Sequence, residues 1–207
     1  MKTALFVSLM GLLLAGPATA QTKHAWDFTP HLGVMAPLAN VVDAGAIATG
    51  TPAAEHNVDL MLGGLLTYWW APEWAVELGV MYAPNGIDSE AFSVPGTVDA
   101  TFFTMSGRLV YDFGQNPEKP AVLLTGGLGF FVTDYDEPLS MITGGMGLVG
   151  LGLRIPLSTR LALRIDVTDY LTTTNWELDG GGETDKLLQN DLTIKGGLTF
   201  SFGKTVN

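Results

Sequence analysis

Hydrophobic and polar residues alternate along residues 192–203, which read LTIKGGLTFSFG. One set of alternate positions holds Leu192, Ile194, Leu198, Phe200 and Phe202, and the other holds Thr193, Lys195, Thr199 and Ser201. Successive side chains of a β-strand point to opposite faces of the sheet. The pattern therefore predicts a strand with one apolar and one polar face. It leaves open whether the apolar face meets a protein core or another apolar medium.

The same alternation recurs along the chain, between segments rich in Gly, Pro, Asn and Asp that are typical of turns. Eight strands are predicted, over residues 26–35, 57–70, 74–83, 98–113, 120–135, 141–155, 160–171 and 189–202. Each is long enough to cross a bilayer, since a tilted strand needs about 9 to 11 residues. The pattern therefore predicts an all-β chain with eight antiparallel strands.

The predicted connections alternate in length along the chain. Three are short, at residues 71–73, 114–119 and 156–159, and three are long, at residues 36–56, 84–97 and 172–188. The connection at 136–140 is short for its place in this series. Short turns at one end and long loops at the other are typical of up-and-down transmembrane β-barrels, which must close because an open sheet edge cannot be satisfied in hydrocarbon. An even strand number places both termini on one side, expected to be the periplasm.

The N-terminus has the features of a bacterial secretory signal peptide. Lys2 is followed by the apolar run Ala4 to Ala15, and Ala18-Thr19-Ala20 forms a small-residue cleavage site. The apolar run is too short for a membrane anchor, which needs about 20 residues. We therefore expect a signal peptide over residues 1–20 and one outer membrane β-barrel domain over residues 21–207.

Composition narrows the class of protein. The formal net charge is −11, which argues against nucleic acid as a partner because phosphates attract basic surfaces. The absence of cysteine excludes disulfides and thiolate chemistry. Charged residues make up only 15% of the chain, against about a quarter in soluble domains. No apolar run after the signal peptide is long enough for a transmembrane helix, so we expect the apolar surface to be spread over the strands.

Charged residues fall on the predicted lumen face of the strands, opposite the Leu, Val and Phe side chains. This face holds the predicted salt-bridge network Asp59, Glu77, Arg108, Arg154, Arg164, Asp166 and Lys195, with Asp27 and His31 as further candidates on the first strand. Charges in a narrow lumen must be paired or hydrated, so the mixed signs predict a salt-bridged plug. Lumen glycines are expected to leave small water pockets: Gly79, Gly127, Gly129, Gly150, Gly152 and Gly197.

Aromatic residues gather at the predicted strand ends. The predicted girdle consists of Trp26, Tyr68, Trp70, Trp74, Tyr111 and Phe113, with Phe28, Trp69, Phe200 and Phe202 nearby. Aromatic girdles mark the membrane interfaces of transmembrane barrels. The alternative is a soluble, lipocalin-like ligand-binding barrel with its aliphatic side chains inside.

Two segments carry a family resemblance, LALRIDVTDYL from Leu161 and NDLTIKGGLTFSFG from Asn190. With the signal peptide, they make the mature chain similar to the small outer membrane β-barrel family, the eight-stranded OmpA/OmpX-like barrels. The resemblance implies that Leu198, Phe200 and Phe202 form the signal read by the outer membrane insertion machinery. The chain departs from the pattern because residues 203–207 follow the last aromatic. The resemblance also implies a location in the outer membrane of a Gram-negative bacterium, among its lipids and lipopolysaccharide.

Few residues of this chain are suited to catalysis or metal binding. Lipid A deacylases of similar size resemble serine hydrolases with a late histidine, whereas this chain has only His24, His31 and His56. We therefore expect neither catalysis nor a cofactor. The loop WELDGGGETDK is a weak Ca²⁺ candidate through Glu177, Asp179, Glu183 and Asp185, although a solvated acidic loop explains the same residues.

These patterns favour a monomeric integral outer membrane protein with a structural or surface-interaction role. A narrow passive channel for small solutes, apolar ones included as in OmpW-like barrels, is the alternative function. The soluble ligand-binding barrel is a third class.

Overall fold

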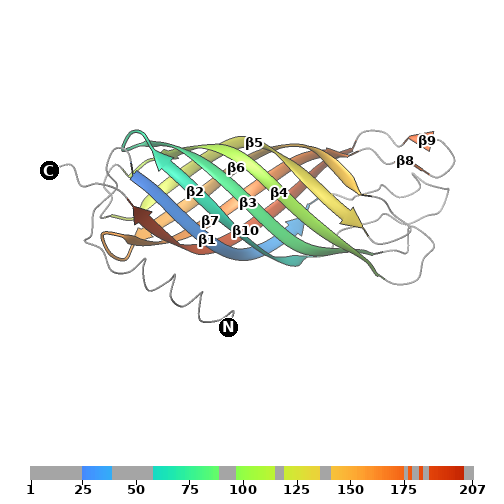
Figure 1. Ribbon diagram of the computed structural model, residues 1–207, viewed down its shortest axis with the longest axis horizontal. Coiled ribbons are helices and arrows are strands. Elements are labelled where there is room, and N and C mark those ends of the chain that lie inside the picture. The colour runs from blue at the N-terminus through green and yellow to red at the C-terminus, as the bar shows by residue number, and fades with distance from the viewer. Residues whose placement is uncertain are drawn as a thin grey trace.

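The structure, a computed structural model, is a closed antiparallel β-barrel (Figure 1). It describes residues 25–38, 58–88, 97–114, 119–135, 141–174, 177–178, 182–183 and 187–202. The barrel strands are β1 (Ala25–Pro37), β2 (Asp59–Trp69), β3 (Trp74–Asp88), β4 (Thr97–Asp112), β5 (Ala121–Tyr135), β6 (Ile142–Pro156), β7 (Leu161–Thr174) and β10 (Leu187–Phe202). The predicted fold is therefore confirmed. Within these ranges no helix is long and apolar enough to cross a membrane.

Each barrel strand pairs with the barrel strands before and after it in the chain. The first, β1, pairs with the last, β10, which closes the barrel in the order β1-β10-β7-β6-β5-β4-β3-β2. The labels β8 and β9 belong to two short strands outside the barrel. Trp26 lies opposite Phe202, so the first and last strands begin and end at the same rim. We call this rim, where β2–β3, β4–β5 and β6–β7 are joined, the turn end. The opposite rim is the loop end. Figure 1 shows the strands tilted steeply against the barrel axis, as closure requires.

Several strands run further toward the loop end than the alternation predicted, β3 and β7 most of all. β3 was expected to end at residue 83, but its pairing with β4 continues to Asp88 opposite Thr97. Pro84 is tolerated there because β2 pairs with β3 only as far as Tyr82, so the missing N–H removes no bond on that side. Similarly, β7 continues to Thr174 because it pairs with β10 up to Leu187.

The long connection after β7 also contains two short strands. β8 (Glu177–Leu178) and β9 (Gly182–Glu183) pair antiparallel as a separate small sheet. The alternation gave no sign of them, because two residues are too few to show a period.

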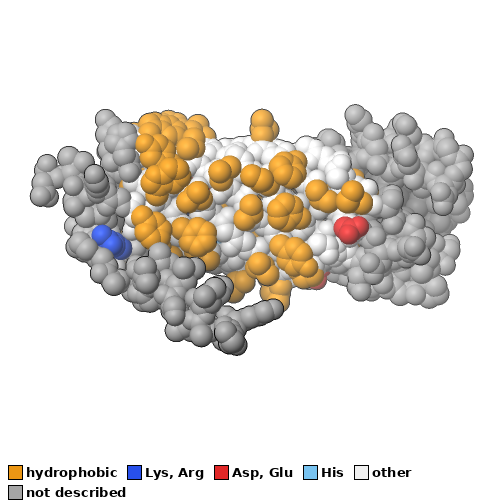
Figure 2. All heavy atoms as spheres, viewed as in Figure 1, with side chains coloured by type: hydrophobic (Ala, Val, Ile, Leu, Met, Phe, Trp, Pro, Cys, Tyr) orange, Lys and Arg blue, Asp and Glu red, His pale blue; other side chains and the backbone are white. Residues whose placement is uncertain are grey.

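The outward face of the barrel is apolar, as predicted. Aliphatic side chains on alternate positions are exposed, for example Leu78 at 52%, Leu151 at 58% and Ile194 at 49%. Figure 2 shows hydrophobic side chains over the barrel wall, with acidic and basic atoms only near the two ends of this face. A soluble barrel would place these residues inside, so the lipocalin-like alternative is wrong.

The interior is arranged in three layers along the barrel axis. An apolar cluster lies at the turn end: Ala25, Trp69, Ala75, Val110 and Leu123. A second apolar cluster lies toward the loop end: Met35, Met61, Met81, Ala83, Phe102, Phe131, Met146, Leu148 and Tyr170. A layer of buried charged residues, with Glu77, Arg108, Arg164, Asp166 and Lys195, lies between them. The lumen is therefore filled by side chains, as the diameter of eight strands permits.

Candidate functional site: the barrel lumen

Glu77 on β3 is the centre of the charged layer. Its side chain is 1% exposed and accepts a hydrogen bond from Thr67 Oγ1 at 2.8 Å. Arg164 Nη1 on β7 forms an ion pair with Glu77 Oε2. Arg108 Nη1 on β4 lies 3.5 Å from Glu77 Oε1. One carboxylate thus serves two guanidinium groups from two other strands.

The two arginines are held by further partners. Arg164 Nε donates to Asp166 Oδ1 at 3.0 Å. Arg108 Nε donates to Ser106 Oγ at 3.0 Å, and Arg108 Nη2 donates to the Tyr170 hydroxyl at 2.9 Å. Planar guanidinium groups suit such sites because they present several fixed donors. The network therefore extends from the middle of the lumen to the apolar layer near the loop end, where Tyr170 lies.

Lys195 on β10 shares this layer but makes no ion pair within the described residues. It lies opposite Asp166 in register, is 1% exposed, and its Nζ atom is 5.8 Å from the centroid of the Tyr170 ring. Its Nζ atom, like both ring nitrogens of His31, meets no side-chain hydrogen-bond partner among the described residues. A cation near an aromatic face is attracted to the ring, so Tyr170 contributes to holding this charge.

Two polar contacts stand apart near the turn end. Asp27 Oδ2 accepts a hydrogen bond from the indole nitrogen of Trp69 at 2.8 Å. Arg154 Nη2 on β6 lies 2.9 Å from Asp112 Oδ2 on β4. The alternation predicted Arg154 in the lumen. It also indicated an inward Asp112, between the outward residues Tyr111 and Phe113, but this position was missed.

Asp59 does not join the charged layer. It lies opposite Met35 at the loop-end start of β2, beside the methionine-rich cluster, and it is only partly buried. The predicted network is thus divided by the structure. Glu77, Arg108, Arg164 and Asp166 are connected, Lys195 is adjacent, Arg154 pairs with Asp112, and Asp59 lies apart.

The lumen glycines do not leave water pockets, so that expectation was wrong. A Cβ atom on Gly152 would lie 2.5 Å from Asp166 Oδ1, and one on Gly79 would lie 2.9 Å from Arg108 Nη2. One on Gly150 would lie 2.8 Å from Thr125 Oγ1. Polar side chains of the neighbouring strands fill the space beside these three glycines, which allows a dense charged layer in a narrow barrel.

The methionine-rich cluster at the loop end was also missed. Met35, Met61, Met81 and Met146 are each at most 4% exposed. Met61 lies between outward Leu60 and Leu62, and Met81 lies between outward Val80 and Tyr82, so the pattern contained the signal. It was overlooked because a polar lumen was expected throughout.

The predicted girdle residues lie at the turn end of the outward face. Trp26 and Tyr68 rings are 4.8 Å apart, Trp74 and Tyr111 are 4.7 Å apart, and Tyr111 and Phe113 are 4.8 Å apart. Trp70 stacks on Trp74 at 6.5 Å. Trp69 is different, because it points into the lumen and is 2% exposed.

The other predicted features lie at the ends of the chain or in loops. Leu198, Phe200 and Phe202 share one face of β10, where Phe200 lies opposite Phe28. Residues 1–20 and 203–207, with His24 and His56, are outside the described residues, as are the side chains of Glu177, Asp179, Glu183 and Asp185. Among the described residues, no three His, Asp or Glu side chains are grouped so that they could hold a metal ion.

Comparisons with solved structures show the fold. OprG from Pseudomonas aeruginosa matches with a TM-score of 0.62 and 13% identity, over 91% of this chain and 100% of its own. Neisserial surface protein A matches with a TM-score of 0.59 and 10% identity, over 86% and 97%. The outer membrane protein AlkL, solved in lipid bilayers, matches with a TM-score of 0.54 and 18% identity, over 93% and 97%.

A search of curated protein sequences finds no match. The family model described as "Outer membrane protein beta-barrel domain" matches residues 6–202. That match covers nearly the whole chain, which therefore belongs to the outer membrane protein β-barrel family.

Proposed function

We propose that this protein is a closed, non-catalytic barrel of the outer membrane whose role is structural or depends on contacts of its loops. One observation carries the proposal: the ion pair of Arg164 with Glu77 crosses the lumen. In the barrel order, three strands separate β7 from β3 in either direction. The two residues therefore project from opposite walls, and their pairing closes the middle of the lumen.

The layers above and below support closure. Trp69, Val110 and Leu123 pack together at the turn end, and the methionine-rich cluster packs toward the loop end. An ion crossing this lumen would have to leave water and displace paired charges, which is costly in a low dielectric. A barrel filled in this way serves better as a membrane scaffold for its loops than as a pore.

The absence of catalysis is part of this proposal. His31 is the described histidine of the lumen, and neither of its ring nitrogens meets a side-chain hydrogen-bond partner. Nucleophilic catalysis needs a base in contact with a hydroxyl or other nucleophile, and His31 makes no such pair. In the same layer, Arg108 and Arg164 are paired with Glu77 and not with His31.

Orientation and partners follow from the same proposal. The turn end, where β1 begins and β10 ends, faces the periplasm, and the longer connections face the outside. The barrel is monomeric, and its surroundings are outer membrane lipids and lipopolysaccharide, reached through the insertion machinery that reads the last strand. With a net charge of −11 for the whole chain, contact with lipopolysaccharide phosphates would require bridging divalent cations.

Single-channel recording in planar bilayers tests closure. We expect the wild-type protein to show no steady ion conductance. The combined variant Glu77→Gln, Arg108→Gln and Arg164→Gln removes the crossing charges and should conduct measurably. The control Asp134→Asn changes an exposed carboxylate and should behave as the wild type. A wild-type protein that conducts as well as the combined variant would contradict a closed lumen.

The methionine-rich cluster favours a second candidate, a narrow passage for small apolar solutes. Methionine side chains are flexible and polarisable, and they repack around apolar ligands. Four of them surround the loop-end lumen with Phe102 and Phe131, whose rings are 6.0 Å apart. This layer could admit a small apolar molecule without opening the charged layer to ions.

Uptake of a radiolabelled short alkane into proteoliposomes tests this second function. Replacing Met61 and Met81 with phenylalanine stiffens the layer and should slow uptake. The same change at outward-facing Met105, which is 39% exposed, serves as the control. Equal uptake by protein-free vesicles and by all three proteins would exclude the passage.

A further inference from the structure

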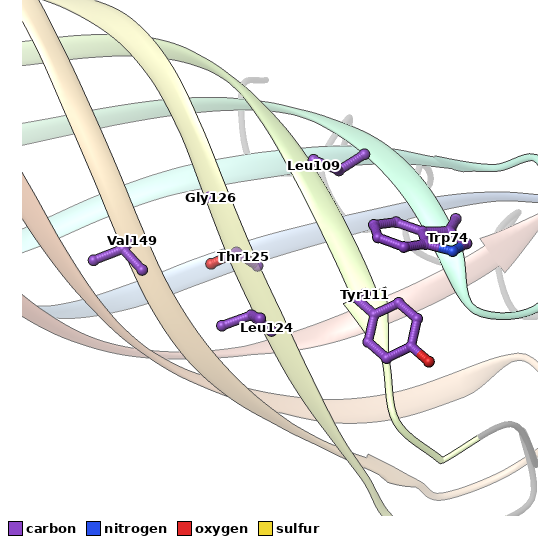
Figure 3. A pocket seen from close by; sticks show the side chains of 7 residues that line it. All are labelled: Trp74, Leu109, Tyr111, Leu124, Thr125, Gly126 and Val149. Carbon is purple, nitrogen blue, oxygen red and sulfur yellow. The ribbon is translucent and has the colours of Figure 1, made fainter.

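The lipid-facing wall of the barrel carries two apolar grooves separated by Leu109. The larger has a volume of about 770 Å³ and is lined by Trp74, Leu109, Tyr111, Leu124, Gly126 and Val149 (Figure 3). The smaller has a volume of about 400 Å³. Its lining is mostly apolar, with Trp26, Leu66, Tyr68, Leu78, Gly107 and Leu109 among its residues, and also includes the buried lumen residues Glu77 and Arg108. Figure 3 shows that the residues of the larger groove come from β3, β4, β5 and β6.

Two outward-facing glycines create these hollows. Gly107 lies on β4 and Gly126 lies on the neighbouring strand β5. Leu109, two positions after Gly107 on β4, is the register partner of Gly126. A Cβ atom on Gly107 would meet no atom within 4 Å, and one on Gly126 would meet only the Leu148 carbonyl oxygen at 3.9 Å. Unlike the lumen glycines, these two are therefore not required by close packing within the chain. Their missing side chains leave space for something outside it.

The grooves run from the turn end toward the middle of the barrel wall. Trp74 begins β3 and Tyr111 is next to the last residue of β4, so both stand at the turn-end rim. Val149 lies at the middle of β6. Aromatic side chains at such a rim sit at the level of lipid headgroups, so the groove beyond them extends into the hydrocarbon of that leaflet.

A basic residue stands at the rim. Lys119 is exposed in the connection between β4 and β5, the two strands that supply Gly107 and Gly126. Lys119 lies at the same rim as Trp74 and Tyr111, the level at which lipid headgroups are found, whereas the apolar walls suit hydrocarbon. The arrangement thus follows the polarity of a phospholipid, with charge at the rim and two apolar grooves beyond it.

We infer that the two grooves bind the two acyl chains of one diacyl phospholipid, astride Leu109, with the headgroup phosphate beside Lys119. The inference depends on the outer membrane location of the family and not on closure of the lumen. Its failure would leave the proposed function intact, because conductance and lipid retention are measured separately.

Native mass spectrometry of the detergent-solubilised protein with added phosphatidylglycerol tests the site. The variant Gly107→Leu with Gly126→Leu fills the grooves and should bind the lipid at least roughly tenfold more weakly than the wild type. A tenfold change in affinity corresponds to about 1.4 kcal/mol. Gly145→Leu is the matched control, because Gly145 is also exposed on the wall and a Cβ there meets no atom within 4 Å. It should bind like the wild type.

Lys119→Gln tests the headgroup half by itself and leaves the barrel wall unchanged. It should weaken phosphatidylglycerol binding, and electrophoresis without boiling checks that each variant is folded. If the leucine variant does not fold, Gly126→Ala with Lys119→Gln replaces it, with the same expected direction.

Equal binding by wild type, groove variant and control would overturn the inference. So would a wild-type dimer that the leucine substitutions dissociate, because the grooves would then be an interface between two copies of this chain.

Discussion

Arg164 and Glu77 are 87 positions apart in sequence and project from opposite walls of the barrel, yet their side chains form a direct ion pair. Both are buried, and Glu77 also serves Arg108. The pair ties β7 to β3 without any backbone contact between these strands. It therefore braces the barrel across its diameter, in addition to closing the lumen.

Glu77→Gln is expected to destabilise the barrel strongly. The change leaves Arg164 and Arg108 as buried cations that have lost their shared carboxylate, and breaking a buried pair in this way costs about 3–5 kcal/mol. Urea unfolding in lipid vesicles, followed by tryptophan emission, measures the free energy of unfolding.

Asp134→Asn is the control for that experiment. It makes the same carboxylate-to-amide change at an exposed position of β5, where substitutions are usually within about 0.5 kcal/mol. Similar losses in both variants would show that the crossing pair contributes no special stability.

Trp69→Phe should destabilise the turn end of the barrel. The indole nitrogen donates to Asp27 at 2.8 Å, and a buried polar group that loses its hydrogen-bond partner costs about 1–3 kcal/mol. Phenylalanine keeps most of the apolar contact but leaves the buried carboxylate without this donor.

Trp26→Phe provides the comparison, since Trp26 is 46% exposed on the outward face. The temperature at which each variant loses its fast mobility on unboiled gels reports the difference. If Trp26→Phe falls as far as Trp69→Phe, the loss comes from aromatic area at the interface and not from the hydrogen bond.

Gly152→Val is expected to disturb the charged layer. A Cβ atom there would lie 2.5 Å from Asp166 Oδ1 and 3.3 Å from Leu123 Cβ, so Asp166 must move away from Arg164. Overpacking of this kind costs about 1–3 kcal/mol. Gly145→Val places the same side chain in open space on the outer wall and should leave the free energy of unfolding in vesicles nearly unchanged. Equal stability of the two variants would contradict the tight lumen packing.

The sequence predicted the barrel well because alternation reports directly which medium each face meets. Leu192, Ile194 and Lys195 could be assigned from parity alone, and the strand number followed from repetition of the same pattern. Strand ends were less accurate, as at Asp88 and Thr174, because beyond the membrane both faces of a strand meet water and the alternation fades. Hydrogen bonding to the neighbouring strand decides where such a strand stops.

The partners of the lumen charges could be predicted much less well. Parity shows that Glu77 and Arg164 face inward, but which charge meets which depends on barrel stagger and side-chain length. Arg154 pairs with Asp112 for this reason, whereas Asp59 is carried toward the methionines at the other end. The glycines were misjudged because the same residue type has opposite roles on the two faces. Gly152 makes room for Asp166 inside, and Gly126 leaves a groove outside.

Arginine substitutions on the outer wall test which part of the strands lies in the hydrocarbon of the membrane. Leu151 within β6 and Leu157 in the β6–β7 turn are similarly exposed, at 58% and 56%. Leu151→Arg places a charge in hydrocarbon and should cost about 2–4 kcal/mol, as near a bilayer midplane, whereas Leu157→Arg lies at the interface and should cost about 0–1 kcal/mol. Unfolding by urea in vesicles measures both. Because the two substitutions remove the same side chain at the same exposure, only the difference in depth separates them. Equal costs would place the apolar band elsewhere along the strands, and with it the level at which Trp74 and Tyr111 meet the headgroups.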